Sequence, residues 1–426
     1  MQRYEAYKDS GVEWIGEIPE GWGAERLKTQ LEERKESNNP IKTDFILSLT
    51  NTRGVIPYSE KGDIGNKAKE DLSSYRLARP GDIVLNSMNV VIGSVGLSRY
   101  FGAVSPVYYM LFPRDEQSDV RYFNYIFQMP AFQDSLKGLG NGIMEIRMRI
   151  PMSKLNDVKL PIPSTGEQRA IADYLDEKTA EIDSIVSQTD RSIELLREYR
   201  KSVISEAVTK GLDPDAPMRD SGIEWIGEIP AGWEVTKFRW VLERVSRDPL
   251  PDDEVVTCFR DGEVTLRTNR RTDGFTMSDK EIGYQHICRG DFVIHGMDGF
   301  AGAMGISDSE GKASPVLMAF NARGAEDLRY INYLLRFYAW QDVFLSLSTT
   351  IRVRSCDLNW GKVAPIPVTL PFPREQQAIA DYLDAKTAEI DSLIADKQRQ
   401  VELLKEYRKS LISEAVTGKF KVPGLE

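Results

Sequence analysis

The sequence has few of the residues on which most enzymes and metalloproteins depend. It contains two histidines, His286 and His295, and three cysteines, Cys258, Cys288 and Cys356. No CxxC pair, HExxH motif or GxxxxGK phosphate loop occurs in its 426 residues. Two histidines are too few for two symmetric histidine-based sites, and the missing motifs exclude the common zinc and P-loop nucleotide sites. We therefore predict no catalytic residue and no bound metal, and we interpret the cysteines as reduced thiols of a cytoplasmic protein.

Long hydrophobic runs are also missing. No apolar segment approaches the ~18–20 residues that span a bilayer, and the N-terminal MQRYEAYKDS lacks the apolar core of a signal peptide. We therefore predict no membrane association. The net charge of −10 argues at first against nucleic acid. However, residues 23–163 contain 19 basic and 16 acidic residues, so locally basic faces are compatible with DNA.

The sequence contains two internal repeats. DSGVEWIGEIPEGW (9–22) returns as DSGIEWIGEIPAGW (220–233), and Glu167–Gly211 returns as Glu375–Lys419 with 31 of 45 positions identical. The segments between the repeats, 23–166 and 234–374, differ in most positions. Two matching frames around two divergent inserts indicate one scaffold that presents two specificities. We expect the divisions 1–163 (first domain), 164–211 (first spacer helix), 212–373 (linker and second domain), 374–419 (second spacer helix) and 420–426 (tail).

The longer repeat predicts a helix of unusual length. Glu167–Thr209 contains no Gly or Pro, and Ser164 lies three residues before Glu167, the spacing of a helix-starting capping box. Apolar residues recur at heptad positions a and d through both copies, which favours a coiled coil between them. The alternative is an amphipathic helix that packs only on its own domain. The predicted seam consists of Leu175, Ile182, Val186, Ile193, Leu196, Val203, Leu383, Ile390, Ile394, Val401, Leu404 and Leu411.

The two inserts share short motifs when they are aligned at an offset near 209. Gly93–Gly96 matches Gly302–Gly305, and Arg121–Tyr125 matches Arg329–Tyr333. Short β-prone runs and helical spacing of apolar residues alternate along both inserts. We therefore predict an α+β chain, with two similar globular domains joined by two long helices. The predicted strands are Asp82–Leu85, Val104–Phe112, Phe292–His295 and Val316–Phe320, and the predicted domain helices are Val120–Gln128 and Leu328–Phe337.

The repeated WIGEIPxGW element, the Gly-Asp strand starts at 81–82 and 290–291, and the EQxAIADYLDxKTAEID helices resemble the specificity subunit of type I restriction-modification systems. The resemblance covers essentially the whole chain. It implies two target-recognition domains that each read one half of a split site in double-stranded DNA, and an antiparallel coiled coil that acts as a spacer. It also implies two methyltransferase subunits and two motor-nuclease subunits as partners. S-adenosylmethionine, ATP and Mg would then be cofactors of those partners, with none in this chain.

Arginines alternate with apolar residues in one short segment of each insert. Arg147 and Arg149 alternate with Ile146, Met148 and Ile150, and Arg352 and Arg354 flank Val353. In a strand this spacing places both arginines on one face, where they suit phosphates and guanine edges. The alternative is a solvent-facing ridge that is paired with carboxylates. We predict DNA contact for these four arginines.

The loops offer further candidates for DNA contact. Asn86, Ser87 and Asn89 follow a predicted strand in the first insert, whereas His295 and Asp298 hold the equivalent places in the second. Different hydrogen-bonding groups on one scaffold are what base readout requires, although loop drift gives the same pattern. Polar, basic loops supply the remaining candidates, which are DNA-facing or simply solvated: Lys67, Lys69, Arg267, Arg270 and Arg271.

Two other features have structural interpretations. Gly299–Gly305 is rich in glycine, but no βαβ pattern surrounds it, and a tight turn is favoured over a nucleotide site. The repeated tryptophans Trp22 and Trp233 are interpreted as core anchors, since identical residues cannot discriminate between different half-sites. The predicted function is DNA recognition without catalysis. The rivals are a coiled-coil scaffold for protein interactions and a self-sufficient modification enzyme.

Overall fold

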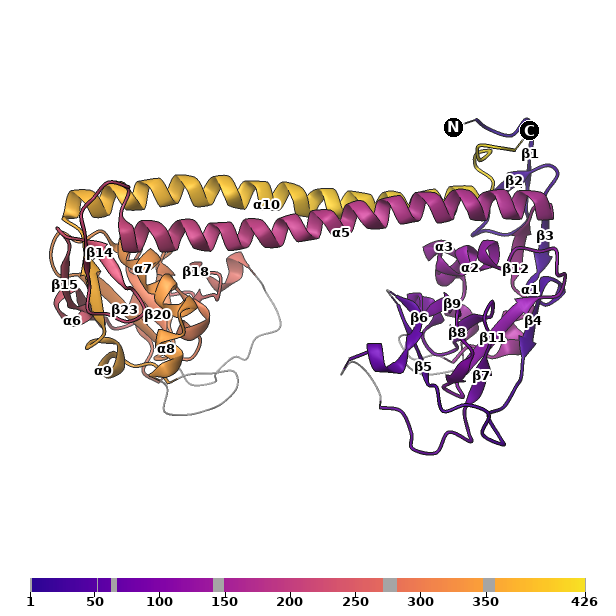
Figure 1. Cartoon of the computed structure of the whole chain (residues 1–426), viewed down its shortest axis with the longest axis horizontal. Coiled ribbons are helices and arrows are strands. Elements are labelled where there is room, and N and C mark those ends of the chain that lie inside the picture. The colour runs from indigo at the N-terminus through magenta and orange to yellow at the C-terminus, as the bar shows by residue number, and fades with distance from the viewer. Residues whose placement is uncertain are drawn as a thin grey trace. The chain divides into compact units, whose positions relative to one another are not determined.

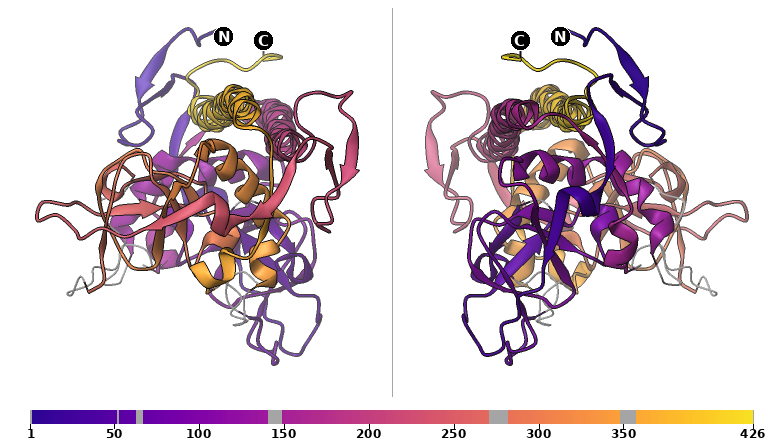
Figure 2. Two further views of the ribbon diagram at one scale, coloured as in Figure 1. Left: turned by 90° about the vertical axis from the view of Figure 1, so that its left-hand side faces the viewer. Right: turned by 90° about the vertical axis from the view of Figure 1, so that its right-hand side faces the viewer.

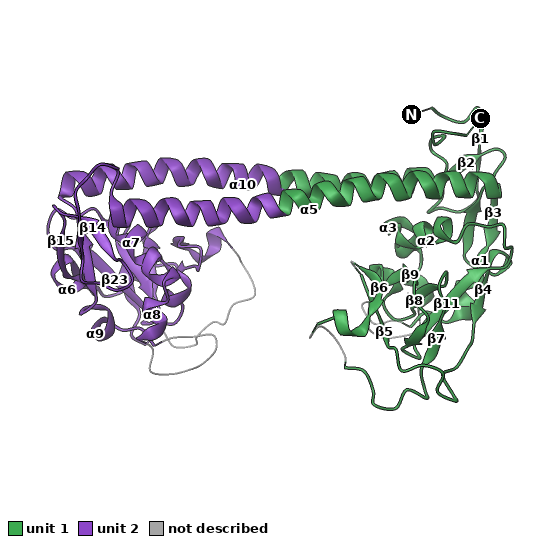
Figure 3. Ribbon diagram, in the orientation of Figure 1, with its two compact units in different colours: residues 1–190, 399–426 green, residues 191–398 purple. Residues whose placement is uncertain are grey.

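The computed structural model describes residues 2–51, 53–62, 67–140, 149–270, 282–347 and 357–425. The chain divides into two compact units, one formed by residues 1–190 with 399–426 and the other by residues 191–398 (Figure 3). Two long helices, α5 (Thr165–Lys210) and α10 (Pro373–Val416), each continue from one unit into the other (Figure 1). Each unit therefore contains one globular domain and half of each long helix.

The central sheets of the two domains have the same strand order. In the first unit the order is β4-β11-β8-β9, and in the second it is β16-β23-β20-β21, with antiparallel pairing throughout. The prediction of one fold for two divergent inserts is thus confirmed. These strands are β4 (Leu31–Arg34), β8 (Ile83–Asn86), β9 (Val95–Leu97), β11 (Tyr108–Pro113), β16 (Leu242–Val245), β20 (Phe292–His295), β21 (Met304–Ile306) and β23 (Leu317–Ala322).

Each unit also contains two-stranded antiparallel pairs, and these too correspond between the units. The pairs β1–β2, β3–β12, β5–β6 and β7–β10 of the first unit match β13–β14, β15–β24, β17–β18 and β19–β22 of the second. Their bounds are β1 (Tyr7–Asp9), β2 (Glu17–Pro19), β3 (Gly23–Arg26), β5 (Leu47–Thr50), β6 (Gly54–Pro57), β7 (Arg76–Ala78), β10 (Gly102–Val104), β12 (Lys159–Ile162), β13 (Met218–Asp220), β14 (Glu228–Pro230), β15 (Glu234–Lys237), β17 (Val256–Cys258), β18 (Val264–Leu266), β19 (Gln285–Ile287), β22 (Gly311–Ala313) and β24 (Pro367–Leu370).

The predicted domain helices are present. The first, α2, begins and ends as predicted (Val120–Gln128), and the second, α7 (Leu328–Trp340), is three residues longer than predicted. Aspartates cap both, because the side chains of Asp119 and Asp327 accept hydrogen bonds from the second helical N–H groups. The remaining helices are short: α1 (Leu27–Gln30), α3 (Pro130–Ser135), α4 (Met152–Leu155), α6 (Phe238–Val241), α8 (Val343–Ser346), α9 (Trp360–Val363), and the 3-10 turns η1 (Tyr58–Glu60), η2 (Val90–Ile92), η3 (Lys137–Leu139), η4 (Arg267–Asn269) and η5 (Gly299–Ala301).

One predicted strand is divided. The run Val104–Phe112 forms the end of β10 and most of β11, with a turn between them in which Tyr108 N–H donates to the Ser105 carbonyl at 3.0 Å. Pro106 lies in this turn and has no N–H to give to a ladder. The prediction of a single strand was wrong here, because it relied on the apolar pattern and ignored the proline that interrupts it.

The long helices start as predicted and pair in antiparallel fashion in both units. Ser164 Oγ donates to Glu167 Oε2 at 2.8 Å, and Glu167 N–H donates to Ser164 Oγ at 3.3 Å, so the capping box is present. In the first unit Arg408 forms an ion pair with Asp183 at 3.0 Å, and in the second Arg200 pairs with Asp391 at 2.9 Å. Figure 2 shows the two helices side by side when they are viewed along their length.

All twelve predicted seam residues are buried or half-buried. Ile193, Ile390 and Ile394 form a cluster between the two helices in the second unit. Towards the helix ends the same stripe packs on the globular domains, since Leu175 belongs to the core of the first unit and Leu383 to that of the second. The coiled coil is therefore confirmed, and the amphipathic alternative describes only its ends.

Large aromatic side chains dominate both cores. Trp22 and Trp233 are 2% and 3% exposed, and each indole N–H donates to a glutamate of the long helix beside it, Glu167 or Glu375, at 3.0 Å. These bonds fix the repeated WIGEIPxGW elements to the starts of α5 and α10. No helix in the described part of the chain is both long and apolar enough to cross a membrane.

Candidate nucleic-acid interface

The turns after β8 and β20 place the first group of predicted DNA contacts. Asn86 Oδ1 accepts the backbone N–H of Met88 at 3.0 Å. His295 Nδ1 accepts the N–H groups of Met297 and Asp298 at 3.2 and 3.1 Å. Both side chains are half-buried and use one acceptor to hold their own turn. Burial lowers the pKa of His295, so the neutral ring carries its proton on Nε2, which is then a donor.

The neighbouring candidates differ in accessibility. Asp298 is half-buried and pairs with Arg260 at 2.7 Å, and Asn89 is half-buried. Ser87 is completely buried and donates to the Val107 carbonyl at 2.7 Å. The structure thus gives the Ser87 hydroxyl a role inside the domain, which corrects its assignment to a DNA-facing surface. Alternation along β8 could not have revealed this, because Ile83, Val84 and Leu85 are all completely buried and both faces of the strand are covered.

The arginine-bearing segments are described only in part. Arg149 is exposed and its neighbour Ile150 is 1% exposed. Ile150 N–H donates to the Ser87 carbonyl at 2.9 Å, so Arg149 lies close to the turn after β8. Arg147, Arg352 and Arg354 fall outside the described residues. DNA contact by these four arginines stays a prediction.

The basic loops follow the hairpins β5–β6 and β17–β18. Lys67 and Lys69 are exposed. Arg267 is half-buried, and its Nε donates to Thr257 at 3.3 Å. Arg270 stacks on the Phe259 ring at 4.2 Å and pairs with Asp261 at 2.7 Å and Glu263 at 3.1 Å. These carboxylates offset the Arg270 charge, as the solvated-loop alternative allowed, and Arg271 lies outside the described residues.

The shared glycines hold these hairpins against the central sheets. Gly93 and Gly302 adopt left-handed conformations, with φ of 81° and 89°, where they end the 3-10 turns η2 and η5. A Cβ on Gly96 would lie 2.8 Å from the Gly54 Cα, and one on Gly305 would collide with the Gly262 carbonyl. The Gly-rich segment is therefore a turn and a close backbone contact beneath the hairpin. This contact packs the central sheet against the hairpin, β5–β6 or β17–β18, from which each basic loop extends.

One flank of the paired long helices carries apolar residues that the sequence reasoning overlooked. These residues occupy heptad positions c and g, beside the seam. The same four positions recur in each unit, because an antiparallel pair of repeated helices presents equivalent surfaces at its two ends. In the first unit, burial and, to a smaller extent, the neighbouring Tyr407 raise the pKa of Tyr174. The residues are Tyr174, Ile185, Leu403 and Tyr407 in the first unit and Tyr382, Leu393, Leu195 and Tyr199 in the second, all exposed except the half-buried Tyr174.

Comparisons with known proteins agree with this architecture. Residues 34–195 match the model of the type I restriction modification DNA specificity domain. A putative type I restriction enzyme MjaX specificity subunit from Methanocaldococcus jannaschii is 24% identical, and the alignment covers 96% of both chains. The MjaVIII specificity subunit of the same organism is 22% identical over 96% of this chain and 95% of its own length.

Solved structures share the fold. A chain from a study of complex assembly and conformational transition in the type I R-M system has a TM-score of 0.70 with 13% identity, over 95% of this chain and 99% of its own. The HsdS subunit from Thermoanaerobacter tengcongensis has a TM-score of 0.51 with 13% identity, over 95% and 98%. At this level of identity the likeness shows the fold, which has two similar domains and two long helices. Over nearly its whole length, the chain is similar to specificity subunits of type I restriction-modification systems.

Proposed function

We propose that each globular domain reads one half of a bipartite, asymmetric site in double-stranded DNA, and that the long helices join the two readers. The observation that supports this proposal is that the two domains have the same central sheet but carry different side chains where its strands end. Asn86 and His295 are the last residues of the equivalent strands β8 and β20, yet they offer an amide in one unit and a neutral imidazole in the other. Groups that differ in this way discriminate between base edges in the major groove.

We infer that the chain itself performs no catalysis. Methylation, with S-adenosylmethionine, is then a reaction of two methyltransferase subunits, and DNA cleavage, with ATP and Mg, is a reaction of two motor-nuclease subunits. The complex works on DNA in the cytoplasm. The absence from the sequence of the common catalytic motifs supports this division of labour. Methyl transfer by the purified chain alone would contradict it.

The two apolar flanks of the helix pair support the presence of two identical partner subunits. In the first unit the flank lies opposite Asp173 and Asp176, which contact the globular domain. Ile185, Leu403 and Tyr407 of this flank are exposed and open to a partner, whereas Tyr174 packs edge-on against Phe420. Because the second unit repeats the flank, one kind of partner surface fits both. We propose that the methyltransferase subunits bind here.

Sequencing of methylated bases, in a host with and without this chain, tests the proposed function. We expect a site of two different specific halves separated by a short non-specific gap. The halves should lie about one helical turn apart, ~34–36 Å, on one face of the duplex. One continuous motif, or a perfect palindrome, would contradict the proposal. A protein scaffold without DNA specificity, the rival function, predicts no change in the methylated sites.

The strand arginines give a second test. Replacing Arg147 and Arg149 by Ala should weaken DNA binding at every sequence, because phosphate contacts are lost. The slope of log K against log salt should fall by about 1 for each phosphate contact removed. Binding titrations at several salt concentrations measure this. A large loss of thermal stability at unchanged affinity would show that the arginines serve the fold.

The apolar flanks give a third test. Leu195→Glu with Tyr199→Glu should prevent binding of one methyltransferase subunit, and Leu403→Glu with Tyr407→Glu should prevent binding of the other. Loss of a well-buried interface anchor costs about 2 kcal/mol or more, roughly 30-fold in affinity, for each residue. Native mass spectrometry should count one partner with either pair changed and none with both. Two partners bound to the fourfold variant would place the interface elsewhere.

A further inference from the structure

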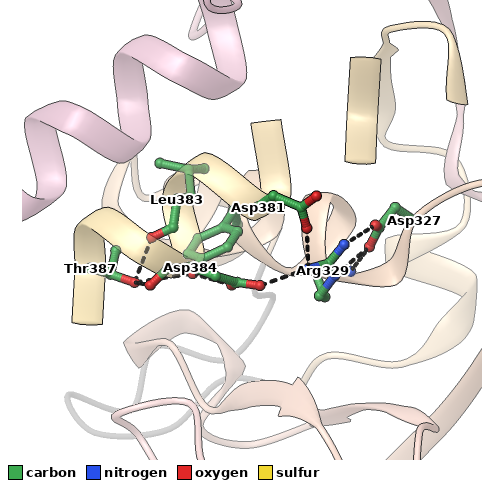
Figure 4. Close-up of polar contacts among 7 residues, drawn as sticks. Asp327, Arg329, Asp381, Leu383, Asp384 and Thr387 are labelled. Atoms are coloured by element: carbon green, nitrogen blue, oxygen red, sulfur yellow. Dashed lines mark hydrogen bonds and ion pairs between the residues drawn. The ribbon is translucent and has the colours of Figure 1, made fainter. Parts of the chain in front are cut away.

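A cluster of charged and hydroxyl groups joins the second globular domain to its long helix (Figure 4). The guanidinium of Arg329, on α7, donates to Asp327 at 2.7 Å and to Asp381 and Asp384 on α10, both at 2.8 Å. One turn further along α7, Tyr333 Oη donates to Asp384 Oδ1 at 2.8 Å and lies 3.2 Å from Thr387 Oγ1. We call this set the Arg329 cluster.

The first unit contains the same cluster on α2 and α5. Arg121 binds Asp119, and it reaches Asp173 at 2.8 Å and Asp176 at 2.7 Å. Tyr125 Oη donates to Asp176 Oδ1 at 2.6 Å and lies 3.3 Å from Thr179 Oγ1. This is the Arg121 cluster. The two inserts differ at most positions, yet both keep the pattern Asp-x-Arg-Tyr-x-Asn-Tyr that builds it.

Apolar burial and ion pairs make different contributions to the contact between each domain and its helix: the first holds the two together, and the second sets their orientation. Each domain adheres to its helix through a large apolar core that includes Leu175 or Leu383, and such burial contributes roughly 25 cal/mol per Å². The arginine side chains are 32% and 35% exposed, so each ion pair adds little to stability, about 0–1 kcal/mol. Apolar contacts have no preferred direction. A planar guanidinium held by three carboxylates does have one.

The shifts in pKa agree with this geometry. The hydrogen bonds that Arg329 donates to Asp327, and then those to Asp381 and Asp384, raise its pKa against the opposing effect of burial. Burial raises the pKa of Tyr333 to about 12. At neutral pH the arginine is therefore charged and the tyrosine keeps its donor proton, so each contact of the cluster retains its direction.

We propose that Arg121 and Arg329 are positioning residues that fix the angle of each recognition domain on its spacer helix, and so restrict the protein to one gap length between half-sites. The inference rests on the proposed function. A small change of angle is sufficient. A tilt of about 10° moves a reading surface roughly 20 Å away by about 3.5 Å, the rise of one base-pair step.

The test measures methylation by the chain in complex with its methyltransferase subunits, on a DNA library that keeps both half-sites and varies the gap one base pair at a time. Wild type should methylate one gap length. Arg329→Ala should methylate the two neighbouring lengths to within about tenfold of the original, with the half-site sequences unchanged. Arg329→Lys, which keeps the charge and loses the planar fork, should fall between them. Arg399→Ala, an exposed position on the outer side of α10, is the matched control and should behave as wild type.

Thermal unfolding of each variant separates positioning from folding. A folded Arg329→Ala protein that keeps a single gap length overturns the proposal. A destabilised Arg329→Ala protein whose methylation falls equally at all gap lengths also overturns it, because the role is then purely structural. In that case Arg121→Ala and Tyr333→Phe should give the same result. If wild type itself shows no preference for a bipartite site, the proposed function fails instead, so the two failures are distinguishable.

Discussion

Exchanging residues 23–163 for the corresponding insert of a related subunit should change one half of the recognised site and leave the other half and the gap unaltered. The reason is the independence of the two cores. The first domain has its own sheet and aromatic core, and it joins the frame through Arg121, which binds carboxylates of α5, and through Tyr122, whose hydroxyl donates to the Val416 carbonyl of α10. An insert that supplies an arginine at the Arg121 position should therefore dock as the native one does.

The change in specificity should be large. Each mismatched base pair in a half-site costs about 1–3 kcal/mol, so a changed three-base half-site alters discrimination by several orders of magnitude. Sequencing of methylated bases reads both halves at once. The matched control is an exchange with an insert whose donor lacks the arginine. It should still change the half-site but should relax the gap. Alteration of both halves by either exchange would show that the domains do not read DNA independently.

The repeats made the architecture predictable, because duplicated residues with the same chemistry must satisfy the same contacts twice. The heptad seam, the capping box at Ser164 and the helices α2 and α7 follow from short-range rules of spacing and capping. The division of Val104–Phe112 into two strands does not follow from these short-range rules. A turn inside an apolar run depends on which strands the two flanking segments pair with. β10 pairs with β7, whereas β11 joins β4 and β8.

The candidate site was less predictable because exposure and charge pairing depend on tertiary partners. Ser87 and Asn86 are adjacent and equally polar, but only one of them points into the core. Arg270 belongs to a basic run in sequence, yet Asp261 and Glu263 from the preceding hairpin neutralise it. Arg121 and Arg329 were visible as a repeated motif. Their role required knowledge of which carboxylates of the long helices face them.

Insertion of one heptad into both long helices, beside Thr189 and Lys397, should lengthen the gap in the recognised site. Seven residues preserve the a/d seam and extend each helix by about 10 Å. That length corresponds to roughly three base pairs at 3.4 Å per step. The added duplex turns the half-sites relative to each other by about 100°, so we expect weaker binding at the longer gap than in wild type. Gap-library methylation measures both effects.

An insertion into one helix alone is the decisive control. Beyond the insertion point, it displaces the a and d residues of that helix by one heptad relative to the partner helix. It therefore separates either Arg200 from Asp391 or Arg408 from Asp183, whose ion pairs mark the native register. The apolar flank of that helix shifts with them, so assembly with the methyltransferase should be lost even where the globular domains still bind DNA. A doubly lengthened protein that binds tightly at the original gap would falsify the role of the helices as a ruler. They would then serve only to dock partners, and the gap would have to be set by the domains themselves.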